Sequence, residues 1–338
     1  MEALSIALAI ALATVLIAEF INGWTDAPNA IATVISTGVM PPRTAILMAV
    51  VMNTIGAMSG TAVAATVGKG IVHPGALTLP SITAAMCSII AWGGIAARFG
   101  IPVSKSHALL AGLAGAAFAG GGIGALQWTG WQKVGTGMIL SIVLGALAAF
   151  LIGLLIIRFS GGSKPSKTKT KYDRASILAA CFMAFNHGLN DGQKFMGVFV
   201  TTLIAGGALT KFEIPYWVIV LCAVTMGLGT SFGGWRIIQT VGSKMTRLQS
   251  WQGFAAQTSA GFTIFGASLY GIPLSTTHTI TSGIVGAAAS KRVSDVRWTV
   301  LKRIVLAWIV TFPFCALIAY LAATAANALF HTGTIAPL

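Results

Sequence analysis

The sequence predicts an all-α polytopic membrane protein made of two inverted-topology repeats. We expect about ten to twelve transmembrane segments, including broken or re-entrant helices. Apolar residues make up 56% of the 338 residues and charged residues only 8%, and the mean hydropathy is +0.85. A soluble domain would carry about a quarter charged residues. In addition, two unusual polar motifs each occur twice, in the same order, once in each half of the chain.

Six apolar segments approach or reach the ~20 residues that a helix needs to cross a bilayer. They are 3–21, 44–67, 82–97, 139–157, 217–232 and 304–326. The first segment is predicted to be retained rather than cleaved as a signal peptide, because Glu2 precedes it and the first basic residue is Arg43. Four isolated cysteines suggest neither a metal nor a redox cofactor.

The first repeated motif contains an aspartate. Gly23-Trp24-Thr25-Asp26-Ala27-Pro28-Asn29 recurs as Gly188-Leu189-Asn190-Asp191-Gly192-Gln193-Lys194, with an offset of 165 residues. The second repeated motif contains serine and histidine. Gly100-Ile101-Pro102-Val103-Ser104-Lys105-Ser106-His107 recurs as Gly271-Ile272-Pro273-Leu274-Ser275-Thr276-Thr277-His278, with an offset of 171 residues. The chain is therefore predicted to be a duplication.

The basic residues predict the topology. The net charge of +14 could indicate a nucleic-acid partner, but the positive charges cluster in loops, above all in the stretch 160–174. We therefore expect a first repeat at 1–159, a basic cytoplasmic linker at 160–174 and a second repeat at 175–338. With five crossings per repeat and both termini outside, 16 of the 21 Lys and Arg residues are cytoplasmic, as the positive-inside rule requires.

The duplicated Asp motif is a candidate transport site, since polar, Gly-rich interruptions at corresponding places in two halves mark such sites. Gly and Pro are expected to break the helix and free backbone groups, while Asn22, Asp26 and Asn29 offer oxygen ligands. An ionisable residue at membrane depth costs about 2.5–3.5 kcal/mol and indicates function. The place suits a cation, a proton or one end of an anion.

The duplicated Ser/His motif is a candidate anion site. Pro followed by hydroxyl residues is typical of a helix start, and a helix N-terminus favours a tetrahedral oxyanion. The hydroxyl donors would be Ser104, Ser106, Ser275, Thr276 and Thr277. Simple N-capping is the alternative interpretation. His107 and His278, together with Glu19, are candidates for a proton relay.

At these four motifs the chain resembles the PiT-type inorganic phosphate transporters, in particular the bacterial low-affinity phosphate carriers, and the resemblance covers nearly the whole chain. It implies a secondary active transporter in the cell (inner) membrane that moves phosphate by cation symport with alternating access. By position, it implies that Asp26, Asp191 and the five hydroxyl residues bind substrate. The coupling ion would be held by Asn22, Asp26, Asn29, Asn190, Asp191 and Lys194.

Two departures from the family pattern bear on coupling. Thr25 stands where many members have Asn, and Lys105 stands between the two hydroxyl residues of its motif. Lys194 occupies the position that matches Asn29, so its ammonium would take the place of a sodium ion. We therefore favour proton over sodium coupling, with metal-phosphate as a further possible substrate. No fixed metal and no resident cofactor are expected.

Three alternatives remain open. A sulfate permease of the same fold is the nearest, because Lys105 and Lys194 would neutralise carboxylates that otherwise repel sulfate. An intramembrane hydrolase is disfavoured, since two similar half-sites do not supply distinct nucleophile and base, and so we predict no enzyme. A passive channel is the third. Membrane lipid and a homodimer partner are expected, and nucleic acid is not.

Overall fold

The computed structural model describes residues 2–73, 75–160 and 165–330, which form fourteen α-helices and four short 3-10 or π turns. A single bridge between Val72 and Leu126 is the only extended pairing in these ranges. Of the expected linker, residues 161–164 lie outside the described ranges, as do residues 331–338 of the second repeat. Helix α8 already begins at Pro165, inside the stretch expected to be a linker.

The first repeat contains seven α-helices and a 3-10 turn. They are α1 (Glu2–Asp26), α2 (Pro28–Ser36), α3 (Pro42–Ala57), α4 (Ala62–Gly70), α5 (Leu79–Phe99), α6 (Lys105–Gly121), η1 (Gly122–Ala125) and α7 (Trp128–Ser160). The second repeat has the same order: α8 (Pro165–His187), η2 (Gly188–Gly192), α9 (Gln193–Ala205), α10 (Tyr216–Ser231), α11 (Trp235–Gln239), η3 (Thr240–Lys244), α12 (Ser250–Leu269), α13 (Thr276–Ala289), η4 (Val293–Asp295) and α14 (Trp298–Phe330).

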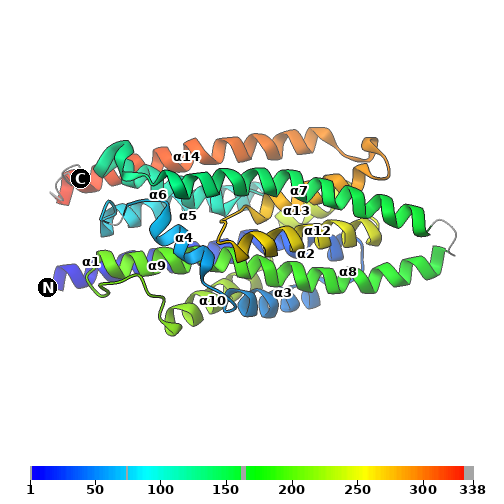
Figure 1. Cartoon of the computed structure of the whole chain (residues 1–338), viewed down its shortest axis with the longest axis horizontal. Helices are drawn as coiled ribbons and strands as arrows, with labels where there is room; N and C mark the ends of the chain where they lie inside the picture. The colour runs from blue at the N-terminus through cyan, green and yellow to red at the C-terminus, as the bar shows by residue number, and fades with distance from the viewer. Residues whose placement is uncertain (1, 74, 161–164, 331–338) are drawn as a thin grey trace.

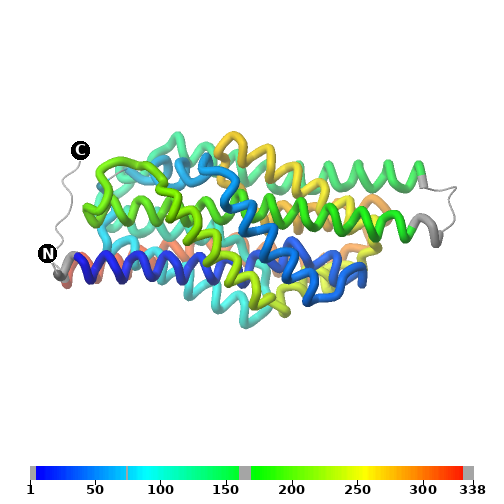
Figure 2. Tube along the Cα trace, turned by 90° about the horizontal axis from the view of Figure 1, so that it is seen from below, coloured from blue at the N-terminus to red at the C-terminus, as the bar shows by residue number. Residues whose placement is uncertain are grey.

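The helices form one elongated bundle. Helix α1 begins and α14 ends at the same end of the bundle, whereas α7 ends and α8 begins at the opposite end (Figures 1 and 2). The first repeat therefore makes an odd number of net passages along the bundle and the second repeat returns. This is the inverted arrangement that the charges predict. Which end faces the cytoplasm stays a prediction.

Two helical hairpins reach into the bundle from opposite ends (Figure 1). Helices α5 and α6 pack together, as do α12 and α13. Each hairpin turns at a glycine with positive φ, 66° at Gly100 and 64° at Gly271, a conformation that glycine adopts without steric cost. The helix that follows begins at the Ser/His motif, as predicted. We call residues 100–104 and 271–275 the first and second hairpin tips.

The two repeats interlock rather than fold side by side. Helix α6 packs on α14 and its counterpart α13 packs on α7, while α1 packs on α10 and α3 on α8. Glycines permit these contacts, because small residues let helix backbones approach closely. A Cβ atom at Gly56 would stand 1.9 Å from the carbonyl oxygen of Phe185, and one at Gly229 would stand 2.0 Å from that of Phe20.

The structure corrects two expectations about helix breaks. At Asp26 the chain stays helical apart from one turn residue, and residues 5–36 count as a single span. At Asp191 the helix widens into the π turn η2 instead of breaking. The real bends lie elsewhere, 68° between α3 and α4 and 66° between α10 and α11. The predicted single span 44–67 is therefore two helices.

The number of segments stays a prediction. Among the described residues, five helices are long and apolar enough to cross a membrane, or up to seven if each bent pair is one span.

The glycine contacts can be tested by adding a methyl group. Gly56→Ala should destabilise the protein by about 1–3 kcal/mol, because the Cβ atom would overlap the α8 backbone. Gly94→Ala in α5 is the matched control, since a Cβ atom there meets nothing within 4 Å. Thermal unfolding of the two purified variants in detergent would measure the difference, and equal stability would contradict close packing at Gly56.

Candidate functional site

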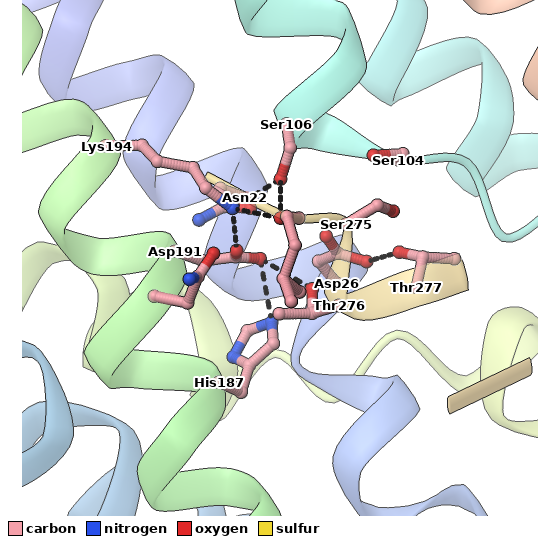
Figure 3. A network of polar contacts seen from close by, with 12 residues as sticks. Asn22, Asp26, Ser104, Ser106, His187, Asp191, Lys194, Ser275, Thr276 and Thr277 are labelled. Carbon is pink, nitrogen blue, oxygen red and sulfur yellow. Dashed lines mark hydrogen bonds and ion pairs between the residues drawn. The ribbon is translucent and has the colours of Figure 1, made fainter. Parts of the chain in front are cut away.

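The two Asp motifs and the two Ser/His motifs meet in the centre of the bundle (Figure 3). They belong to α1 and α2, to η2 and α9, and to the starts of α6 and α13. Asn29 Nδ2 lies 3.2 Å from Thr277 Oγ1, and Lys194 Nζ lies 2.5 Å from Ser106 Oγ. Because each contact joins the two repeats, the site lies at the repeat interface.

The first half-site is built around Asp26. Its Oδ1 atom accepts hydrogen bonds from the Thr277 hydroxyl and, at 2.6 Å, from Asn29 Nδ2. One and two turns earlier on α1, Asn22 and Glu19 face each other, with Asn22 Nδ2 donating to Glu19 Oε2 at 3.2 Å. All five side chains are buried.

The second half-site is built around Asp191. Its Oδ1 atom accepts from Lys194 Nζ at 2.5 Å and its Oδ2 atom from Thr276 Oγ1 at 2.8 Å. Lys194 Nζ also donates to Ser106 Oγ and, at 2.8 Å, to the carbonyl oxygen of Leu274. His187 Nε2 lies 3.3 Å from Asp191 Oδ2, an approach without hydrogen-bond geometry.

The two half-sites repeat one arrangement with different chemistry. Asn29 bridges Asp26 and Thr277 in the first, and Lys194 bridges Asp191 and Ser106 in the second. A neutral amide on one side is therefore replaced by an ammonium on the other. The second half-site carries its own cation.

Unsatisfied acceptors gather in the first half-site. Among the described residues, four fully buried carboxyl and amide oxygens of α1 and α2 have no hydrogen-bond partner: Glu19 Oε1, Asn22 Oδ1, Asp26 Oδ2 and Asn29 Oδ1. A buried polar atom without a partner is costly. Such a row of oxygens would be satisfied by a cation or by a proton on a carboxyl group.

The serines that begin the two motifs act as helix caps. Ser104 Oγ accepts from the backbone N–H of His107, and Ser275 Oγ from that of His278, both at 3.2 Å. Simple N-capping thus accounts for these two hydroxyls, whereas Ser106, Thr276 and Thr277 contact Lys194 or a carboxylate. The rings of His107 and His278 pack edge to face with centroids 4.5 Å apart, so the predicted relay histidines touch.

The structure also shows the positions of three further polar residues, Asn190, Lys105 and His187. Asn190 donates to Ser268 Oγ at 2.8 Å and to the Ile272 carbonyl oxygen at 3.3 Å. Lys105 is buried, and its Nζ atom has no hydrogen-bond partner among the described residues. His187 lies in the site, although the sequence analysis did not name it as a site residue. The repeat offset of 165 places His187 at the position of Asn22, and this correspondence could have indicated its place in the site.

Asp26, His187 and Asp191 form the one group of acidic and histidine side chains that could hold a metal ion within the described part of the chain. Their potential ligand atoms all lie within 4.8 Å of one another, and all three side chains are buried. Carboxylate oxygens and an imidazole nitrogen suit several divalent cations. The same three side chains can also bind and release a proton.

The comparisons with known proteins agree with this geometry. Residues 22–319 match the model of the phosphate transporter family. The chain belongs to the phosphate transporter family. It is therefore an integral membrane transporter rather than an enzyme, and the hydrolase alternative loses its support.

Curated relatives match along almost their full length. The transporter is 41% identical to a probable low-affinity inorganic phosphate transporter of Rhizobium meliloti, covering 94% of this chain and 95% of that one. It is also 41% identical to the protein of the same name from Bacillus subtilis, covering 92% and 95%. The sulfate alternative is not favoured by these relatives.

A solved structure shares the fold. The chain described as the sodium-dependent phosphate transporter superposes with a TM-score of 0.86, covering 96% of this chain and 99% of the other, at 24% identity. The arrangement of the helices is therefore a fold already seen in a solved structure.

The contact between the Thr277 hydroxyl and Asp26 predicts a specific defect. Thr277→Ala should lower phosphate uptake roughly tenfold or more, because a buried carboxylate that loses a donor costs about 1–3 kcal/mol. Thr279→Ala is the matched control, since that hydroxyl bonds only its own helix, at Ser275 O. Initial uptake rates in proteoliposomes would compare them, and equal rates would remove Thr277 from the site.

Proposed function

We propose that the transporter moves inorganic phosphate across the cell membrane by cation symport, favours protons over sodium, and alternates access around the site between the repeats. Phosphate as substrate is supported by the family and by the names of the curated relatives. Proton preference is supported by the residues of this chain.

The observation that carries the proton preference is the position of Lys194. Its Nζ atom has three oxygen partners, Asp191 Oδ1, Ser106 Oγ and the Leu274 carbonyl, at 2.5–2.8 Å. A bound metal cation would be surrounded by oxygens in the same way. With the ammonium already present, the second half-site needs no sodium ion.

The charges of the site favour one additional positive charge. Glu19, Asp26 and Asp191 are three buried carboxyl groups, and Lys105 and Lys194 are two buried amines. If all are ionised, one negative charge remains, and buried charges that are not compensated are strongly unfavourable. A proton in the first half-site balances the count. A metal-phosphate complex held by Asp26, His187 and Asp191 is a second species that fits.

Phosphate also fits the donors and acceptors better than sulfate. The protonated forms of phosphate present at neutral pH can donate to a carboxylate oxygen such as Asp26 Oδ2, which has no partner among the described residues. Sulfate has only acceptors and would face like charge there. The hydroxyl groups of Ser106, Thr276 and Thr277 would donate to phosphate by giving up their present bonds to the Leu274 carbonyl, Asp191 and Asp26.

Replacing the fixed ammonium should change the coupling ion. Wild-type uptake should require an inward proton gradient and should not respond to sodium at fixed pH. Lys194→Asn, which copies Asn29, should lower proton-driven uptake about tenfold or more, and sodium should then increase the residual uptake. Sodium, but not choline, should also raise the thermal stability of this variant, because Asp191 would otherwise be buried without a partner.

Lys211→Asn serves as the control for charge alone, since Lys211 is exposed in the loop after α9. Wild-type uptake that requires sodium at fixed pH would refute proton preference. If sodium changes neither the uptake nor the thermal stability of the Lys194→Asn variant, the proposal that the Lys194 ammonium takes the place of a sodium ion is refuted.

Glu19 should serve proton release rather than phosphate binding. Glu19→Gln should lower net proton-driven uptake about tenfold but leave counterflow of labelled phosphate against trapped phosphate near the wild-type rate, because exchange needs no net proton movement. Trapped sulfate should support no counterflow. Glu213→Gln, at an exposed position, should change neither rate. Equal loss of net uptake and counterflow would assign Glu19 to the binding site instead.

A further inference from the structure

A cavity of about 530 Å³ lies beside the second hairpin tip, outside the polar site. Its walls come from α4, the first turns of α7 and the end of α12. Its lining residues include Lys69, Thr129, Lys133 and Gly271. We call it the lysine-lined cavity. Helix α7 begins toward the end of the bundle where the chain begins and ends (Figure 1), and its first turns line the cavity.

The second hairpin tip runs from this cavity to the site. Gly271 lines the cavity, and three residues later the Leu274 carbonyl oxygen accepts from Lys194 and, at 3.1 Å, from Ser106. Four residues of chain span at most about 14 Å. A small displacement of the tip would therefore connect the cavity with the site.

The second tip is held by two residues of the site, Lys194 and Ser106, and by Asn190 beside it, while the Ser275 N–H donates to Ser141 Oγ of α7 at 3.3 Å. Asn190 Nδ2 donates to the Ile272 carbonyl oxygen at 3.3 Å, and Lys194 and Ser106 donate to that of Leu274. A ligand that takes over the Lys194 and Ser106 donors removes both hydrogen bonds to the Leu274 carbonyl oxygen and loosens the tip. The position of the second tip is therefore coupled to what the site binds, as a gate requires.

The first tip is held differently. The Pro102 carbonyl oxygen accepts from Trp308 Nε1 at 3.0 Å, and that of Arg98, just before the tip, accepts from the Arg236 guanidinium. Neither donor belongs to the site. The repeat offset of 171 places Gly137 at the position of Trp308, and Gly137 has no side chain to bond the second tip. Of the two tips, the second is the one that site ligands can loosen.

The cavity attracts anions. Lys69 and Lys133 line it from α4 and α7, both lysines are exposed, and no acidic residue is among its lining residues in the described chain. Concave surfaces with one sign of charge raise the local concentration of an oppositely charged ligand and its association rate. A phosphate in this cavity would lie next to the tip that leads to the site.

We propose that the lysine-lined cavity is the vestibule through which phosphate reaches the site, with Lys69 and Lys133 attracting the anion and the second hairpin tip acting as the gate. This inference rests on the proposed function and adds the route and the residues that capture the substrate before it is bound.

The test measures phosphate uptake kinetics in proteoliposomes at low and high ionic strength, adjusted with choline chloride. Lys69→Gln with Lys133→Gln should raise the KM for phosphate about threefold or more, leave kcat within about twofold, and weaken the salt dependence of kcat/KM. Lys69→Arg with Lys133→Arg should behave as wild type. Lys211→Gln removes an exposed lysine of the loop after α9 that does not line this cavity, and should have no effect.

A steric test uses helix α7. Thr129 lines the cavity, so Thr129→Trp should lower kcat/KM at least threefold, whereas Thr136→Trp, exposed on the same helix but outside the cavity, should not. An unchanged KM in the double Gln variant, or equal effects of the two Trp substitutions, would overturn the vestibule while leaving phosphate transport in place. Wild-type protein that takes up no phosphate would instead refute the proposed function, and the vestibule with it.

Discussion

The structure depends on buried ionisable groups of opposite charge that neutralise each other where the two repeats meet. Asp191 and Lys194 lie 2.5 Å apart with almost no exposure to solvent, and Lys194 also bonds the first residues of α6 and the second hairpin tip. Removing one partner of such a pair leaves a buried charge, which costs far more than a surface contact. Because the partners come from different helices, this requirement fixes how the hairpins and the π turn are arranged around the site.

Backbone contacts at glycines make that arrangement possible. Gly23 and Gly188 belong to the Asp motifs, and a Cβ atom at either would lie about 2 Å from a carbonyl oxygen of α10 or α3. The same motif thus supplies the carboxylate and the close approach of the supporting helix. Lipid gives no hydrophobic drive for helix association, so such packing carries much of the stability. Site geometry and helix packing are therefore set by the same short segments.

Much of this could be predicted from the sequence because duplication preserves position. The helix starts at Ser104 and Ser275 and the inverted repeats follow from patterns that capping and charge rules describe. The widened turn at Asp191 could not be predicted, because Gly and Pro lower helix propensity without determining whether tertiary contacts keep the helix intact. The bond from Asn190 to Ser268 depends on long-range packing, which local patterns do not encode. His187 lies four residues before Asp191, so helical spacing could have indicated its approach.

The two lysines make a duplicated site asymmetric. Lys194 stands at the position of Asn29, and Lys105 at that of Thr276. Two identical half-sites would each present a carboxylate that needs an external cation, so phosphate would have to arrive with several ions. Under the proposed symport, a built-in ammonium supplies one of those charges permanently and leaves the open acceptors on α1 and α2 as the place for an exchangeable cation. On that proposal, the number of ions that accompany phosphate depends on which motif residues are amines rather than on the fold.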